Sequence, residues 1–209
     1  MTIIKSFSVG NGDMFYIQHV SDNFSIIDCC LSDKNREEIV NEILNKAKSK
    51  NIIRFISTHP DDDHIRGLKY LDNQLGILNF YCVKNEAIKT DETDDFIRYC
   101  ELRDDSQKAF YLEKGCRRKW MNMGDDERGS AGINILCPIT NNEEFKDALK
   151  QAKEGRNTNN ISPIIEYSLE DGVRAIWMGD LEENFLVKIE DELDLPNADI
   201  VVASELYGI

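Results

Sequence analysis

The residues best suited to chemistry lie in one short stretch, residues 59–64, which reads H-P-D-D-D-H. Three carboxylates packed this closely repel one another, so the cluster is costly unless a cation neutralises it or water solvates it. Imidazole and carboxylate donors together suit a divalent ion, and they are numerous enough to begin a second site. We predict a metal site whose ligands include His59, Asp61, Asp63 and His64. Asp62 or Asp63 would orient the reacting water.

The same aspartates have a structural alternative, an acidic helix N-terminus in which Asp side chains cap backbone amides and complement the helix dipole. Capping accounts for one aspartate or two, but it accounts for neither histidine. The metal interpretation is therefore preferred.

The sequence around this stretch predicts the elements that position it. The β-branched run over residues 52–56 indicates a buried strand, and Pro60 cannot donate to a ladder, so the strand must end before it. Apolar residues at Ile65, Leu68 and Leu71 have helical spacing. The polar cluster thus lies on a strand-to-helix turn.

The stretch T-H-P-D-D-D-H-I-R-G-L resembles the metal-binding signature of the metallo-β-lactamase fold superfamily, H-x-H-x-D-H, with Asp61 in place of the second histidine. This variant is similar to the hydrolase domain of ComEC-type DNA-uptake proteins. Other segments resemble that branch in the expected order: F-S-V-G-N-G-D-M-F at 7–15, I-I-D at 26–28, N-N-I-S at 159–162 and W-M-G-D-L-E at 177–182.

The resemblance implies a four-layer α/β/β/α sandwich and further site residues. Asp180 would bridge two metals, with a helix N-cap as its alternative. Asp13 would support the metal loop, unless it serves only as a turn residue, and Asp28 would orient His59 or His64. Asn160 and Ser162 are weaker candidates for ligands or substrate contacts, because other members supply a third histidine in this region.

One departure from the family pattern concerns the C-terminus. After a predicted strand at 199–203 the family presents a His-His-Gly element with the last metal ligand, whereas this sequence reads S-E-L-Y-G-I and has no histidine after His64. Glu205 lies near the expected position and could donate an oxygen. We therefore expect a C-terminally shortened fold that holds two divalent ions or only one. A protein partner or an additional segment would complete the site.

The rest of the chain predicts a mixed α/β domain. Expected strands cover residues 3–9, 14–20, 24–28, 77–83, 133–137, 162–169 and 173–178, and expected helices lie between residues 33 and 50, over 141–153 and over 182–193. Residues 84–114 are an acidic, helix-leaning insert. They form either part of the cleft wall or a plain surface helix pair.

Composition sets outer bounds. At 209 residues and 41% hydrophobic content, the chain can bury one sizeable core, so we expect a single domain over residues 1–209. No apolar run approaches the ~18 residues of a membrane helix, and the start lacks the features of a signal peptide. The six cysteines show no C-x-x-C spacing. We expect a cytoplasmic protein without a membrane partner.

The net charge of −14 bears on the substrate, because nucleic-acid binders normally carry a basic face. The compact basic run at 117–120 could track a nucleic-acid strand, although a solvated loop is the simpler interpretation. We predict a hydrolase that uses metal-activated hydroxide, with zinc or manganese as cofactor. The ComEC-like resemblance favours a phosphodiester substrate, hence a nuclease or nucleotide phosphodiesterase. The alternative is a catalytically degenerate domain that acts as a binding or regulatory module.

Overall fold

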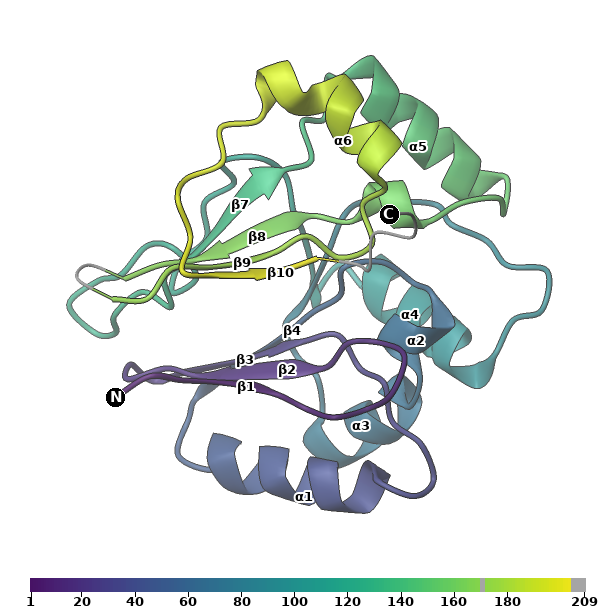
Figure 1. Ribbon diagram of the computed structural model, residues 1–209. Helices are drawn as coiled ribbons and strands as arrows, with labels where there is room; N and C mark the ends of the chain where they lie inside the picture. Colours follow the sequence, from purple (N-terminus) through teal and green to yellow (C-terminus); the bar gives the residue numbers. More distant parts are fainter. Residues whose placement is uncertain (170–171, 204–209) are drawn as a thin grey trace.

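The computed structural model describes residues 1–169 and 172–203. Two β-sheets face each other, and each carries helices on its outer side (Figure 1). The layers therefore run helix, sheet, sheet, helix, which is the predicted α/β/β/α arrangement. The candidate Glu205 lies outside the described residues.

The first sheet has six strands in chain order, β1 (Ile3–Ser6), β2 (Phe15–Gln18), β3 (Asn23–Ile27), β4 (Ile52–Ile56), β5 (Phe80–Cys82) and β6 (Ala109–Tyr111). Strands β1 to β3 pair antiparallel, and β3 to β6 pair parallel. Parallel neighbours need crossover connections. The helices α1 (Arg36–Ala47), α2 (Asp62–Ile65), α3 (Leu68–Leu75) and α4 (Asp94–Asp104) supply them.

The second sheet has the order β10 (Ile200–Val202), β9 (Ala175–Trp177), β8 (Ile164–Tyr167) and β7 (Ile133–Cys137). Helix α5 (Glu143–Lys153) and the short 3-10 helix η1 (Asn159–Ile161) lie between β7 and β8 in the chain. Helix α6 (Glu183–Ile189) and the 3-10 turn η2 (Glu190–Glu192) connect β9 to β10. Helices α5 and α6 cover the outer face of this sheet (Figure 1).

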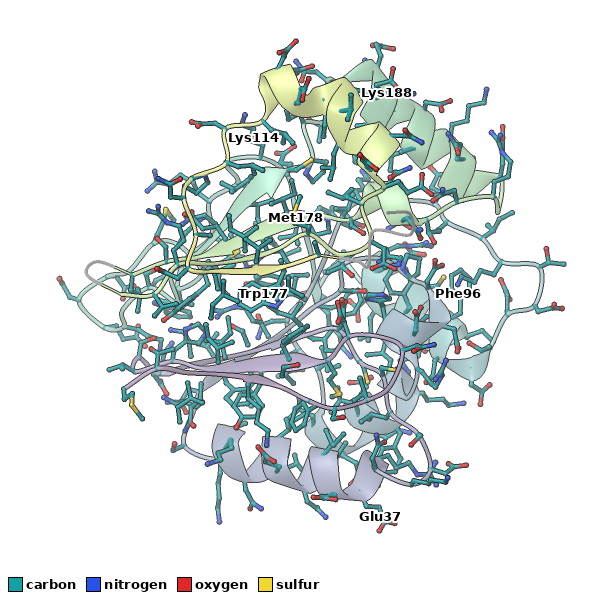
Figure 2. All side chains as sticks on the ribbon, viewed as in Figure 1. Glu37, Phe96, Lys114, Trp177, Met178 and Lys188 are labelled. Carbon is teal, nitrogen blue, oxygen red and sulfur yellow. The ribbon has the colours of Figure 1, made fainter. Side chains whose placement is uncertain are left out.

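Strand alternation divides the core in two. In β2, Phe15 and Ile17 belong to the cluster between the sheets, whereas Tyr16 belongs to the cluster under α1, α3 and α4. Trp177 lies in the layer between the sheets, edge to face with Phe15 at a centroid distance of 6.0 Å (Figure 2). The strands are thus fixed from both faces.

This packing brings several strand ends to one edge of the molecule. Strands β3 and β4 pair parallel, with Ile27 opposite Ile56, so the residues that follow them emerge together. Asp28 follows β3 directly, and the H-P-D-D-D-H stretch follows β4. Strand β9 ends at Trp177 in the other sheet, three residues before Asp180.

The insert at 84–114 differs from the helical expectation. It contains α4, but it also contains the three-residue strand β6, which extends the first sheet beside β5. So short a strand has no periodicity of its own and forms because β5 offers it an edge.

Within the described ranges, no helix has both the length and the apolar character needed to span a membrane.

Candidate metal centre

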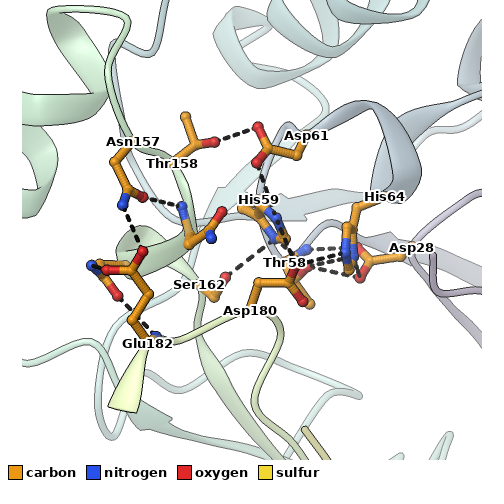
Figure 3. A network of polar contacts seen from close by, with 12 residues as sticks. Asp28, Thr58, His59, Asp61, His64, Asn157, Thr158, Ser162, Asp180 and Glu182 are labelled. Atoms are coloured by element: carbon orange, nitrogen blue, oxygen red, sulfur yellow. Dashed lines mark hydrogen bonds and ion pairs between the residues drawn. The ribbon is translucent and has the colours of Figure 1, made fainter. Parts of the chain in front are cut away.

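Two buried histidines and a carboxylate meet where the strands end (Figure 3). His59 and His64 are 0% and 1% exposed, and their ring centroids lie 4.2 Å apart. The Asp180 Oδ2 atom lies 3.8 Å from His59 Nε2 and 3.4 Å from His64 Nε2. The Oδ2 atom of Asp61 lies 3.6 Å from His59 Nε2. Three donor groups, His59, His64 and Asp180, thus converge on one small volume, and Asp61 adjoins it beside His59.

Asp28 orients His64 rather than His59. Its Oδ2 lies 3.0 Å from His64 Nδ1, so Nδ1 carries a proton, and Nε2, which faces Asp180, is the nitrogen that a metal would bind. The same carboxylate accepts hydrogen bonds from the backbone N–H and the hydroxyl of Thr58, at 2.8 and 2.7 Å. Asp28 has a φ of 56°, a left-handed conformation that aspartate tolerates better than most residues.

His59 is held by hydroxyls. Its Nδ1 lies 3.1 Å from Thr58 Oγ1 and 3.2 Å from Ser162 Oγ. Its Nε2 is buried and has no hydrogen-bond partner among the described residues. A buried polar atom without a partner is costly, and a cation between Nε2 and the facing carboxylates would satisfy it.

The separations between donor atoms fit a metal ion. Ligand bonds of about 2.0–2.1 Å around a tetrahedral ion place two donor atoms about 3.3 Å apart. The separations among Asp61, Asp180 and the two imidazoles are 3.4, 3.6 and 3.8 Å. His59, His64 and Asp180 also form a group whose potential ligand atoms all lie within 4.8 Å of one another. His59, His64 and Asp180 therefore fit a divalent ion with little movement, and Asp61 would join them from the side of His59.

Carboxylates around this group repel one another. Asp13, Asp28 and His64 form a second group of potential ligands within 4.8 Å. Burial, the charge of Asp28 and further charges on Asp180 and Asp63 raise the pKa of Asp13 to about 6, although His64 opposes the shift. Asp13 is positioned by its backbone N–H, which donates to the Asp63 carbonyl at 3.3 Å. A bound cation would relieve this repulsion.

The donors respond differently to the same surroundings. Burial lowers the pKa of His59, and the charge of His64 lowers it further, so His59 is neutral and its Nε2 is free to bind a metal. Burial also opposes protonation of His64, but its bonds to Asp180 and Asp28 outweigh burial and raise its pKa to about 11. In Asp180, burial is outweighed by His64 and His59, and the pKa is lowered.

Asp61 has two partners that the sequence did not indicate. Lys89 Nζ lies 2.9 Å from Asp61 Oδ1, and the Thr158 hydroxyl donates to the same oxygen (Figure 3 shows Thr158). Burial would raise the pKa of Asp61, but His59, Thr158 and Lys89 together lower it. The carboxylate is thus ionised, and its Oδ2 atom remains directed at His59.

The other two aspartates of the stretch lie differently. Asp62 accepts two bonds from Arg66, at 2.9 and 2.6 Å, and its side chain is 52% exposed. The structure therefore does not support a water-orienting role for Asp62, because the i,i+4 pair with Arg66 turns it to solvent. Asp63 lies beside Asp13, although neither group of potential ligands found among the described residues includes it.

Asn160 and Ser162, the two candidates from the N-N-I-S segment, also lie differently from each other. The Asn160 side-chain amide donates to Glu182 at 2.7 Å, and its oxygen accepts from the Glu182 N–H at 3.0 Å. Asn160 thus ties η1 to the start of α6, and both of its side-chain bonds go to Glu182. Ser162 does reach the site, but through His59 Nδ1.

A comparison with protein-family models found no match, and a comparison with curated proteins found none either. Solved structures do match. The metallo-β-lactamase SMB-1 in complex with mercaptoacetic acid gives a TM-score of 0.53 at 11% identity, covering 95% of this chain and 76% of that chain. The subclass B3 metallo-β-lactamase BJP-1 of Bradyrhizobium japonicum gives 0.53 at 12% identity, covering 96% and 75%.

A third match is the metallo-β-lactamase fold protein YhfI from Bacillus subtilis, with a TM-score of 0.47 and 12% identity. It covers 91% of this chain, and this chain spans 62% of the length of YhfI. At such low identities the similarity concerns architecture. The two facing sheets, their outer helices and the matches to SMB-1 and BJP-1 establish that the chain has the metallo-β-lactamase fold.

Proposed function

We propose that this protein is a metal-dependent hydrolase that acts on phosphodiesters. One observation carries the proposal: the partnerless Nε2 of His59 is buried and faces the carboxylates of Asp61 and Asp180. His64 Nε2 shares Asp180 from the other side. A buried nitrogen without a partner and facing carboxylates destabilise the fold unless a cation binds between them.

His59 and His64 would hold the metal through Nε2, and Asp61 and Asp180 through Oδ2. A divalent ion bound there lowers the pKa of coordinated water and neutralises negative charge that develops on an ester. Asp28 fixes His64, and the hydroxyls of Thr58 and Ser162 fix His59. With Asp63 the set would hold three carboxylates and two imidazoles, so manganese is as reasonable a cofactor as zinc.

Asp63 remains the candidate for orienting the reacting water or for completing the metal coordination. It lies in the first turn of the short helix α2, close to residues 10–13, and a Cβ on Gly12 would lie 2.3 Å from the Asp63 carbonyl oxygen. The close approach of Gly12 fixes the backbone of Asp63. Asp63 is thus held on the side of the site where Asp13 and His64 lie.

The phosphodiester assignment has separate support. The H-P-D-D-D-H stretch resembles the ComEC-type branch, whose hydrolase domain acts in DNA uptake. The net charge of −14 favours a short substrate held by metal over a long duplex held by basic residues. The basic run does not change this, because Arg118 stacks over Phe110 at 4.5 Å and Lys119 pairs with Asp125 at 2.7 Å.

The direct test is a substrate panel with protein loaded with zinc or manganese. We expect turnover of bis(p-nitrophenyl) phosphate or of a dinucleotide, and loss of at least about 100-fold in kcat/KM in the His59→Ala variant. A β-lactam, a lactone and a thioester complete the panel. Turnover of one of these with no phosphodiester cleaved would contradict the proposal. Loaded protein that cleaves nothing would be the binding or regulatory module that the sequence leaves open.

A further inference from the structure

We propose that Lys89 is a substrate-binding residue of this site, whose ammonium group holds an anionic oxygen of the substrate beside the metal position. This inference rests on the proposed function, because a phosphodiester carries a negative charge and a lactam ring does not. It also assigns a role to the 84–114 insert, which supplies Lys89.

Lys89 is connected to the metal position through a single carboxylate. Its Nζ lies 2.9 Å from Asp61 Oδ1, while Asp61 Oδ2 lies 3.6 Å from the partnerless His59 Nε2. An ammonium group has three N–H donors, and Asp61 accepts one of them. The Lys89 side chain is 26% exposed, so a ligand entering the site can reach it.

Hydrogen bonds of the neighbouring residues fix the backbone that carries Lys89. The backbone N–H of Ile88 donates to a carbonyl of α5 at 3.2 Å. The nearly buried Arg103 donates to the carbonyl of Ala87 and to the side chain of Asn85, both at 3.3 Å. The Lys89 ammonium also lies 5.7 Å from the centroid of the Phe96 ring. These contacts reduce the entropy lost when Lys89 binds a ligand.

Charge shows what the ammonium contributes. Five carboxylates surround the two histidines, those of Asp13, Asp28, Asp61, Asp63 and Asp180. Even two divalent ions would neutralise only four of them, and Lys89 supplies a further positive charge. Without it the site would keep a net negative charge and repel a phosphodiester. Arg66 does not substitute, because it pairs with the exposed Asp62.

The test is the binding of inorganic phosphate to metal-loaded protein, measured by calorimetry together with metal content. We expect Lys89→Gln to weaken phosphate binding by about tenfold or more, the loss typical of a charge-assisted hydrogen bond, and to leave metal content unchanged. Lys89→Arg should recover most of the affinity. Lys84→Gln is the matched control, because Lys84 belongs to the same segment, is exposed and lies over the Tyr111 ring.

Three results would overturn the inference: no phosphate binding by the parent, equal binding by the parent and Lys89→Gln, or loss of metal in Lys89→Gln. The last would mean that Lys89 acts only by positioning Asp61. The proposed function and the role of Lys89 are contradicted by different results. Phosphate binding that depends on Lys89 without any phosphodiester cleavage contradicts only that function, and cleavage with binding insensitive to Lys89→Gln contradicts only the inference.

Discussion

His59 and His64 present the same nitrogen to the site but are supported by different groups. A carboxylate holds His64 Nδ1, whereas two hydroxyls hold His59 Nδ1. A carboxylate partner makes an imidazole a more basic ligand than a hydroxyl does. The two histidines are therefore expected to contribute unequally to metal affinity, with Asp28 acting through His64.

Replacing Asp28 with asparagine tests this support. Asp28→Asn keeps the shape of the side chain but removes the charge, so we expect metal affinity to fall about 10- to 100-fold. Competition with a chromogenic chelator measures the change. The control is Asp33→Asn, an exposed aspartate paired with Arg36 away from the site. Unchanged affinity in Asp28→Asn would show that His64 needs no carboxylate to bind metal.

His19, the third histidine, lies away from the site and makes folding depend on pH. It is 2% exposed, and its Nε2 lies 2.9 Å from Ser25 Oγ. Burial and the nearby charges of Arg54 and Lys50 lower its pKa to about 3. Below about pH 6.5, His19 binds a proton in the unfolded chain but stays neutral in the folded chain. This contribution to stability is complete above pH 6.5 and is lost as the pH falls toward 3.

We expect His19→Gln to reduce the pH dependence of unfolding. Between pH 7.5 and 5.5, the decrease in the free energy of unfolding should be smaller by about 1 kcal/mol than in the parent. Urea unfolding at the two pH values measures it, with equal metal content in both proteins. Equal decreases in the two proteins would mean that His19 is protonated in the folded state.

Among single residues, the sequence predicted the candidate metal ligands better than the residues that hold those ligands in place. The motif residues His59, Asp61 and His64 lie within six residues of sequence, so their short spacing brings them close together. Lys89 and Thr158 reach Asp61 across 28 and 97 residues, and no local pattern marks them. The i,i+4 pair of Asp62 with Arg66 could have been predicted, since α2 begins at Asp62.

Among the elements, the end of β9 sets the position of Asp180. Gly179 has a φ of 54°, and a Cβ there would lie 2.7 Å from the Cβ and Oγ of Ser162 and 3.0 Å from the Cβ of Thr58. The strand end thus needs a glycine for both conformation and space. Ser162 and Thr58 are also the residues that hold His59, so this close approach links the second sheet to the metal site.

Gly179→Ala should therefore lower the free energy of unfolding through both backbone conformation and steric overlap. Alanine in the left-handed region costs about 1–2 kcal/mol, and the steric overlap adds about 1–3 kcal/mol. Gly76→Ala is the matched control, because Gly76 has a φ of 67° but open space around its Cβ position. Chemical denaturation of both variants measures the difference. Similar losses of stability in the two would mean that the strand end can relax.

Long, periodic elements were predictable and short ones were not. Strand β4 and helix α5 follow clear patterns, since their apolar residues recur at strand and helix spacing. Strand β6 has three residues and forms only because β5 is beside it. The segment that carries Lys89 has no regular structure. Its shape depends on Asn85 and Arg103, whose bonds form only in the folded protein.

For the whole molecule, the net charge of −14 limits how a nucleic acid can bind. We expect metal-free protein to bind duplex DNA more weakly than about 10⁻⁴ M at 150 mM salt, outside the range typical of nonspecific binders. Fluorescence anisotropy with a labelled duplex measures this. A micromolar dissociation constant would mean that local basic residues override the overall charge and that long nucleic acids are candidate substrates.

The central claim, that the strand ends form a metal site, is tested most directly by elemental analysis of protein purified without chelator. The parent and His19→Gln should contain at least about one equivalent of zinc or manganese, and the double variant His59→Ala/His64→Ala should contain less than about a tenth of that. Circular dichroism would confirm that the double variant is folded. A parent without metal after reconstitution, or a folded double variant with as much metal as the parent, would contradict the claim.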